Sequence, residues 1–392
     1  MSQEEWERIK SIFEAALQIP ESGRAAFLRA KCGDEPALYE ILQDLLRNHW
    51  DDSNIHAPSP QQRTFSEGTL VAGRFRITRF INNGAMGEVY EAWDERLRLC
   101  LALKTLRPEL SSAGDALERF HREILIARNV SHENLCRVYD FVEHHPPPSL
   151  SGAEGGLVPC LTMELVAGDS LAEVVRRERP LSLDTALLLI SQIASGLDVL
   201  HDHGIIHRDL KPSNIMLSPR RGPGIRAVLM DFGLAKATDH DGAFFESNTQ
   251  LQVGTPYFMA PELLQNAAPS VASDIYAFGL IIDEMVTRSR AFATPSIQSL
   301  YFAKLWEEPI PPRQRSDGLP EHWERAILGC ICRDSQQRFK EATEVVRVLT
   351  QDLIGQRKVD KATSGPSPRH SLVKNLHARA TCQSLFAVRS SI

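Results

Sequence analysis

The stretch HRDLKPSN, His207–Asn214, is the most informative part of this sequence, and the rest is read outward from it. It places a carboxylate (Asp209), an amine (Lys211) and an amide (Asn214) at short, fixed spacing. The sequence DFG follows at 231–233. Carboxylate and amide oxygens are the hard ligands that Mg²⁺ prefers, and a lysine balances negative charge. A lone DFG occurs by chance, but the two stretches in this order indicate one chemical site.

Transfer of a phosphoryl group needs groups of this kind. A carboxylate must accept the proton of the acceptor hydroxyl, oxygen ligands must hold Mg²⁺ on the nucleotide phosphates, and a cation must balance the developing charge. Asp209 suits the first role and Lys211 the third. Asn214 and Asp231 suit the second. His207 needs no titration in such a reaction, so we assign it a structural role.

The His-Arg-Asp stretch and the Asp-Phe-Gly that follows it resemble the signature of the eukaryotic-like protein kinases. GAMGEVY at 84–90 and GTPYFMAPE at 254–262 extend the resemblance, and their wording is similar to the bacterial serine/threonine kinases in particular. The resemblance covers residues 70 to about 352. It implies an α+β fold of the bilobal protein kinase type, with a β-rich N-lobe over 70–163 and a helical C-lobe over 167–352.

The resemblance also implies an ATP site under a glycine-rich hairpin. Its implied ATP-binding residues are Ile81, Asn82, Asn83, Gly84, Ala85, Met86, Gly87, Val89, Ala102, Lys104, Glu164 and Val166. Asn82 stands where the family has its first glycine. Because asparagine tolerates positive φ better than other non-glycine residues, we expect the hairpin to survive this change. The Glu164 carbonyl and the backbone of Val166 are implied to bond the adenine edge.

Four residues are implied to be catalytic: Asp209, Lys211, Lys104 and Glu123. A lysine that faces a cleft from an apolar strand is costly without an anion, so we expect Glu123 to pair with Lys104 and to orient it toward the α- and β-phosphates. Asn214 and Asp231 are the implied metal ligands, for Mg²⁺ with Mn²⁺ as an alternative.

Three further residues are implied to support the site. Glu262, in the Ala-Pro-Glu element, is expected to pair with Arg338, and Asp274 is expected to brace the backbone of the catalytic loop.

Composition limits the alternatives. A net charge of −6 argues against nucleic acid as a partner, and the seven cysteines contain no Cys-x-x-Cys pair, which favours a reducing compartment. The first residues are acidic and lack an apolar core, so we expect no signal peptide, and no apolar run approaches the roughly 18–20 residues that span a bilayer. The apolar stretches 186–200 and 275–286 are interpreted as core helices. We therefore expect no integral membrane segment and a cytoplasmic location.

The flanks differ from the kinase-like part. Residues 1–50 repeat apolar side chains at helical spacing and predict a small helical segment, and 51–69 is polar and predicts a linker. The kinase domain is expected over 70–352. Residues 355–392 form a basic, serine-rich tail that we expect to be disordered.

The resemblance implies a serine/threonine protein kinase in signal transduction, because Lys211 together with Thr255 is typical of kinases that act on those hydroxyls. Its partners would be ATP and protein substrates. A pseudokinase scaffold is the alternative, favoured by Asn82, and a small-molecule kinase is a weaker third reading. Thr249, and after it Ser247, are the candidate sites of activation-loop autophosphorylation, for which a homodimer is one route.

Overall fold

The computed structural model describes residues 12, 15, 16, 19, 21–33, 38, 39, 42, 63–84, 87–105, 124, 127–145, 157–220, 224–232, 255–287, 289–294 and 297–351. The chain divides into two compact units. The smaller unit contains Met1–His56 and Phe292–Pro309, and the larger contains Ala57–Ala291 and Ile310–Ile392.

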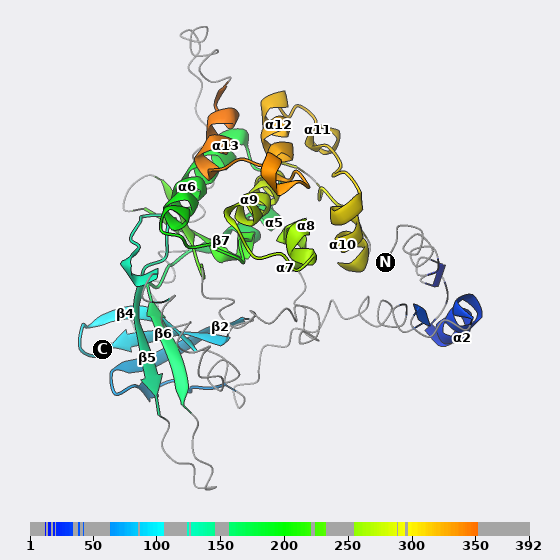
Figure 1. Ribbon diagram of the computed structural model, residues 1–392. Helices are drawn as coiled ribbons and strands as arrows, with labels where there is room; N and C mark the ends of the chain where they lie inside the picture. Colours follow the sequence, from blue (N-terminus) through cyan, green and yellow to red (C-terminus); the bar gives the residue numbers. More distant parts are fainter. Residues whose placement is uncertain are drawn as a thin grey trace. The chain divides into compact units, whose positions relative to one another are not determined.

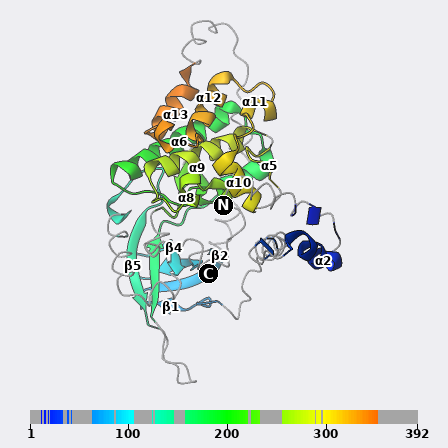
Figure 2. The same ribbon diagram turned by 45° about the vertical axis from the view of Figure 1, so that its right-hand side comes forward.

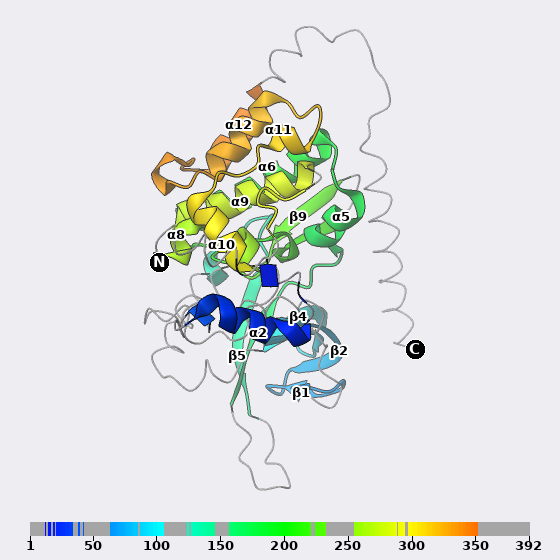
Figure 3. The ribbon, with the colours of Figure 1, turned by 90° about the vertical axis from the view of Figure 1, so that its right-hand side faces the viewer.

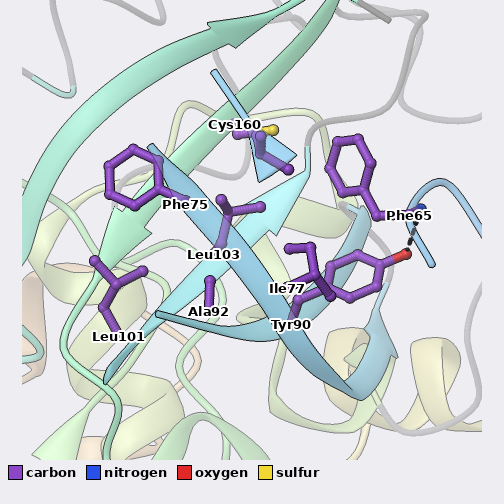
Figure 4. Packing of buried hydrophobic residues seen from close by; sticks show 9 residues of the cluster. Phe65, Phe75, Ile77, Tyr90, Ala92, Leu101, Leu103 and Cys160 are labelled. Carbon is purple, nitrogen blue, oxygen red and sulfur yellow. Dashed lines mark hydrogen bonds between the residues drawn. The ribbon is translucent and has the colours of Figure 1, made fainter. Parts of the chain in front are cut away.

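A six-stranded antiparallel sheet forms the first part of the larger unit (Figures 1 and 2). Across the sheet its strands are β1 (Leu70–Val71), β2 (Phe75–Gly84), β3 (Gly87–Asp94), β4 (Leu99–Thr105), β6 (Val158–Met163) and β5 (Val138–His144). Successive side chains of a strand point to opposite faces. The apolar set on one face packs into a core of Phe65, Val71, Phe75, Ile77, Tyr90, Ala92, Leu101, Leu103 and Cys160 (Figure 4).

Phe65 belongs to this core although it precedes β1. Its side chain is only 4% exposed. The neighbouring Gly68 N–H donates to the carbonyl of Ile77 at 2.8 Å. The last residues of the segment that we expected to be a linker, from Arg63 onward, therefore belong to the folded sheet.

The helical part of the larger unit is built around two apolar helices (Figure 3). Helix α6 (Leu183–Asp202) packs against β9, α13 and α9, and α9 (Val271–Val286) packs against α12. Around them lie α5 (Leu171–Glu178), α7 (Thr255–Phe258), α8 (Pro261–Leu264), α11 (Pro312–Arg315), α12 (Glu321–Cys330) and α13 (Ala342–Leu349). A small antiparallel sheet joins β7 (Asp169–Ser170), β8 (Ile215–Pro219) and β9 (Ile225–Leu229).

Both predictions of core helices are supported by burial. Within the part of the chain that the structure describes, α6 is the one helix whose length and composition would suit a membrane span. Leu189, Ile193 and Leu197 on this helix are fully buried, whereas Leu188 is 40% exposed, as in a helix that packs on neighbouring elements with one face. A serine is the N-cap residue of each of these helices, Ser182 for α6 and Ser270 for α9. Ser182 accepts from the Thr185 N–H at the start of α6, which satisfies a backbone donor that the helix leaves free.

The smaller unit has its own core. Helix α2 (Glu21–Cys32) contributes Leu28 and Cys32, and α10 (Ile297–Trp306) contributes Phe302. The other buried members are Ile12, Ala16, Leu38 and Leu42. Apolar residues from the N-terminal segment therefore share a core with a helix that lies far along the sequence.

Candidate active site

The predicted site residues come from several elements. Those in the hairpin strands are Ile81, Asn82, Asn83, Gly84, Gly87 and Val89. Those elsewhere are Ala102 and Lys104 in β4, Glu164 and Val166 after β6, Asp209 and Lys211 after α6, Asn214 in the 3₁₀ turn Pro212–Asn214, and Asp231 after β9. Predicted residues outside the described part of the chain are Ala85, Met86, Glu123, Ser247 and Thr249.

The backbone of the catalytic loop is fixed by a buried carboxylate. Asp274 of α9 is 2% exposed, and its two oxygens accept from the N–H groups of His207 at 2.7 Å and Arg208 at 3.1 Å. The same carboxylate contacts the ring of His201 at 2.9 Å. Arg208 has a φ of 67°, which non-glycine residues rarely adopt. The prediction that Asp274 braces this loop is confirmed, and its hydrogen bonds offset the cost of the unusual backbone.

Within the loop, three predicted residues meet. One carboxylate oxygen of Asp209 accepts from Lys211 Nζ at 2.8 Å and from Asn214 Nδ2 at 2.9 Å. Asn214 Nδ2 also donates to the Asp209 carbonyl at 2.8 Å. The Asp209 side chain is 25% exposed, so it can be reached by an acceptor hydroxyl while its orientation stays fixed.

The second carboxylate, that of Asp231 after β9, pairs with Lys104 in β4 of the six-stranded sheet. Lys104 is 3% exposed, and its Nζ lies 2.8 Å from Asp231 Oδ1. Removal from water tends to raise the pKa of Asp231, but the charge and the hydrogen bond of Lys104 outweigh it and hold that pKa below its usual value. Asp231 therefore stays ionised. Its φ is 55°, a second left-handed non-glycine residue at the site.

The Met230 N–H donates to the carbonyl of Asn214 at 2.8 Å, so the backbone of Asn214 lies beside the residue that precedes Asp231. An amide oxygen next to an ionised carboxylate is a donor set that suits Mg²⁺. The described residues contain no cluster of three or more His, Cys, Asp or Glu side chains that could hold a metal alone. A cation here would therefore need further ligands, which the phosphates of a nucleotide can supply.

His207, the first residue of the loop, is fully buried. Burial lowers its pKa, more than the nearby carboxylates Asp274 and Asp209 raise it. Both ring nitrogens lack a hydrogen-bond partner among the described residues. A neutral, enclosed imidazole agrees with the structural role that we predicted.

In the hairpin, glycine is required at one position in particular. Gly87 has a φ of 142°, and a Cβ there would lie 2.0 Å from the carbonyl oxygen of Thr105. Asn82 does not need the positive φ that we expected asparagine to tolerate, because the strand runs extended through it. Its Oδ1 instead accepts from the Asn83 N–H at 2.8 Å. The missing glycine is therefore accommodated without a positive φ, directly after the irregularity in strand pairing between Phe80 and Asn82.

The segment after β6, where adenine is expected to bind, has a support that sequence reasoning missed. Arg226 of β9 makes two bonds to the Glu164 carboxylate, at 2.6 and 3.1 Å. The hydrogen bonds with Glu164 raise the pKa of Arg226. The Glu164 N–H also donates to the carbonyl of Arg137 at 2.8 Å. The only signal in the sequence was an arginine inside the otherwise apolar strand IRAVL.

The expected pair below the activation segment is confirmed. Arg338 is 3% exposed and binds both oxygens of Glu262, at 2.7 and 2.8 Å. It also donates to the carbonyls of Cys332 at 2.7 Å and Ala272 at 2.8 Å. These bonds tie α8 to the start of α9, from which Asp274 projects.

Comparison with known proteins identifies the family. The family model described as the protein kinase domain matches residues 75–349. Serine/threonine-protein kinase pkn3 of Myxococcus xanthus is 35% identical over 275 residues, which cover 69% of this chain and 48% of the relative. The probable serine/threonine-protein kinase PknB of Bifidobacterium longum is 32% identical, over 70% of this chain and 39% of the relative. The chain thus spans less than half the length of these relatives.

A solved structure agrees on the fold. The kinase domain of Mycobacterium tuberculosis PknI superimposes with a TM-score of 0.56 and 22% identity, over 74% of this chain and 99% of that one. The likeness confirms the predicted bilobal kinase architecture. Together with the family match over most of the sequence, it shows that this chain belongs to the protein kinase family.

Proposed function

We propose that the protein is a serine/threonine protein kinase that transfers the γ-phosphate of ATP to hydroxyls of protein substrates. The observation that carries the proposal is the placement of Asp209. Its carboxylate is oriented by Lys211 and Asn214 on a loop whose backbone Asp274 holds, while Asp231 next to Asn214 is kept ionised by Lys104. The described relatives carry the names of serine/threonine kinases, which supports the same class of acceptor.

Each side chain then has a distinct task. Asp209 accepts the proton of the acceptor hydroxyl and orients its oxygen for attack. Lys211, 2.8 Å from Asp209, stabilises negative charge that develops on the transferred group. Asn214 and Asp231 would hold Mg²⁺, which neutralises and aligns the phosphates when bound.

The remaining residues would position the nucleotide. Lys104 has its Nζ at the Asp231 carboxylate and can reach phosphate oxygens at the same place. The Glu164 carbonyl and the Val166 backbone would bond adenine, and the Arg226–Glu164 pair would keep that segment in place.

Transfer from radiolabelled ATP tests the proposal. Wild-type protein with Mg²⁺ and a generic acceptor protein should yield labelled phosphoserine and phosphothreonine. Asp209→Asn should lower the rate by roughly 10²- to 10⁴-fold, since that is the usual contribution of a positioned general base. Asp184→Asn, an exposed carboxylate in the first turn of α6, is the matched control and should behave as wild type.

A wild-type rate no higher than that of Asp209→Asn would leave the pseudokinase scaffold as the function. Asn82 was the feature that favoured the scaffold, and its extended backbone removes the reason to expect a defective hairpin.

The proposal includes control by autophosphorylation. Thr249 and Ser247 lie outside the described residues, and Thr249 is the first choice because of its distance from Gly254 in the sequence. A phosphate carries about −1.5 to −2 charges at neutral pH and binds guanidinium groups strongly enough to order a loop.

Thr249→Ala should clearly reduce activity, whereas Ser247→Ala should reduce it less. Mass spectrometry of active protein should find phosphate on Thr249. Adding wild-type protein to inactive Asp209→Asn protein shows whether one copy phosphorylates another, as a homodimer would allow. An unmodified Ser247–Thr249 region in fully active protein would exclude this mode of control.

A further inference from the structure

Residues Arg63–Phe65, which we call the strap, lie against the back of the nucleotide-binding hairpin. In the β3–β4 register, Val89 is opposite Lys104 and Tyr90 is opposite Leu103. Because successive side chains of a strand point to opposite faces, Tyr90 lies on the face away from Lys104. Phe65 packs on that outer face, beside Tyr90 (Figure 4).

Each residue of the strap contacts the hairpin. The guanidinium of Arg63 lies 4.2 Å from the ring centroid of Phe80 in β2. The Thr64 N–H donates to Glu88 Oε2 at 2.8 Å. The Phe65 N–H donates to the Tyr90 hydroxyl at 3.1 Å, and the two rings pack with centroids 5.6 Å apart. The strap therefore holds both strands of the hairpin, close to the turn that covers the phosphates in the proposed function.

Glu88 connects the strap to β4, the strand that contains Lys104. Its carboxylate is buried, and Oε2 also accepts from the Tyr90 hydroxyl at 2.6 Å. The Glu88 N–H donates to Thr105 Oγ1 at 2.9 Å, and this hydroxyl donates to the Glu88 carbonyl at 3.3 Å. Thr105 directly follows Lys104. Contacts of Glu88 thus connect the strap to the strand of Lys104 close to the turn of the hairpin.

A buried carboxylate is stable only when its oxygens are hydrogen-bonded. The Thr64 N–H and the Tyr90 hydroxyl both serve Glu88, and the strap supplies or orients both of them. Without the strap, Glu88 would favour water, and the residues next to it, Gly87 and Val89, would move with its backbone.

We infer that the strap consists of positioning residues for the nucleotide site, which act through Glu88 and Tyr90 and do not touch the nucleotide. This inference rests on the proposed function, in which ATP binds beneath the hairpin. Loss of one such contact should weaken ATP binding roughly 3- to 10-fold, the range expected for the net contribution of one ordinary hydrogen bond. The chemical step should be little affected, because Asp209 and its loop are held independently by Asp274.

Full-length variants test this inference in matched pairs. Phe65→Leu replaces the aromatic ring of the strap with a smaller side chain. Phe75→Leu makes the same change in the same core, but at the end of β2 that is far from the turn, opposite Asp94. Tyr90→Phe removes the hydroxyl that joins Phe65 to Glu88, and Tyr139→Phe removes a hydroxyl from the exposed side of β5.

The measurements are KM and kcat for ATP, the Kd of a non-hydrolysable ATP analogue with Mg²⁺, and the melting temperature. Phe65→Leu and Tyr90→Phe should raise KM and Kd about 3- to 10-fold and leave kcat within about twofold. Phe75→Leu should lower the melting temperature at least as much as Phe65→Leu does, but it should leave KM unchanged. If KM follows the melting temperature equally in Phe65→Leu and Phe75→Leu, the strap is only part of the core, and the inference is wrong.

Hydrogen exchange of the free protein separates this inference from the proposed function. Peptides covering residues 82–90 should exchange faster in Phe65→Leu and Tyr90→Phe than in wild type, Phe75→Leu or Tyr139→Phe. Unchanged exchange there would overturn the inference even in an active kinase. Failure of the wild type to bind the analogue would instead refute the proposed function, while the exchange rates would still decide whether the strap positions the hairpin.

Discussion

The catalytic loop, 207–214, and the glycine-rich hairpin, 82–87, are held in opposite ways. The loop is fixed from inside the helical part, where the buried Asp274 bonds its backbone. In the hairpin, Asn82 and Asn83 are exposed, and its described support is on the outer face of the sheet. Catalysis by a base requires a fixed distance to the reacting group, whereas a cover over a nucleotide must also admit and release it.

The two regions also differ in how they tolerate positive φ. The residues at and near the loop with this geometry, Arg208 and Asp231, are not glycines, and hydrogen bonds or an ion pair support them. The hairpin uses Gly87, where a side chain has no room. The catalytic loop and its neighbour thus have functional side chains at positions with positive φ. The hairpin has glycine at such a position, where in the proposed function the backbone approaches the phosphates.

Lys104→Met should have the largest effect, because it removes the buried cation that pairs with Asp231 and, in the proposed function, binds the phosphates. We expect kcat/KM to fall by about 100-fold or more, each tenfold loss being ~1.4 kcal/mol of transition-state stabilisation. Methionine fills a similar volume, so the melting temperature should change little. Lys340→Met, at an exposed lysine, is the control. Transfer rates like those of wild type in Lys104→Met would remove its assigned role.

Asp274→Asn should loosen the catalytic loop, the more rigid of the two regions. One charged hydrogen bond to the loop is lost, so we expect kcat to fall by roughly 10-fold or more, with little change in KM for ATP. Asp198→Asn is a close match, since Asp198 also accepts from two backbone amides, those of Ala342 at 2.7 Å and Thr343 at 3.0 Å. It should lower stability without lowering kcat. Equal losses of kcat in both variants would show that Asp274 acts through general stability.

The buried His207 should make the loop sensitive to acid. Its pKa is lowered by burial, so below about pH 6.5 the unfolded chain binds a proton that the folded chain does not. Stability from this residue is complete above that pH and falls as the pH drops toward the folded pKa. Urea unfolding should show that the free energy of unfolding decreases less between pH 7.0 and pH 5.5 in His207→Phe than in wild type. An identical loss would mean that His207 does not contribute.

Asn82→Gly should have the smallest effect, and it tests whether the hairpin tolerates a change of residue at this position. It removes the Asn82–Asn83 hydrogen bond and adds flexibility at an exposed, extended position. We expect KM for ATP to stay within about threefold of wild type. A larger rise would mean that the Asn82 side chain makes a specific contact with the nucleotide.

The sequence predicted the kinase fold and the residues of the catalytic loop because their spacing is local. Asp209, Lys211 and Asn214 lie within one turn of chain, so their contact follows from their order. The pairs Glu262–Arg338 and Asp274 with the loop are distant in sequence, and the resemblance to the family supplied them. The roles of the hairpin and adenine-site residues remain predictions.

The contacts that were missed depend on which distant side chains meet. Phe65 was assigned to a polar linker because a single aromatic residue there gives no periodicity, and its partner Tyr90 lies in another element. The Arg226–Glu164 pair joins β9 to the segment after β6, and the resemblance implied a role for the Glu164 carbonyl but none for Arg226. Phe302 could not be matched to the N-terminal helices, since apolar spacing shows that a face is buried but does not identify its partner.

The position of Phe65 also decides where a protein fragment for expression should start. The family match begins at residue 75. A fragment cut there would lack β1, leaving the edge of β2 unpaired, and would uncover Tyr90 and Ile77 on the outer face. Unpaired strand edges and exposed apolar patches promote aggregation. A fragment that starts a few residues before Arg63 retains the covering aromatic ring and should be the more soluble of the two.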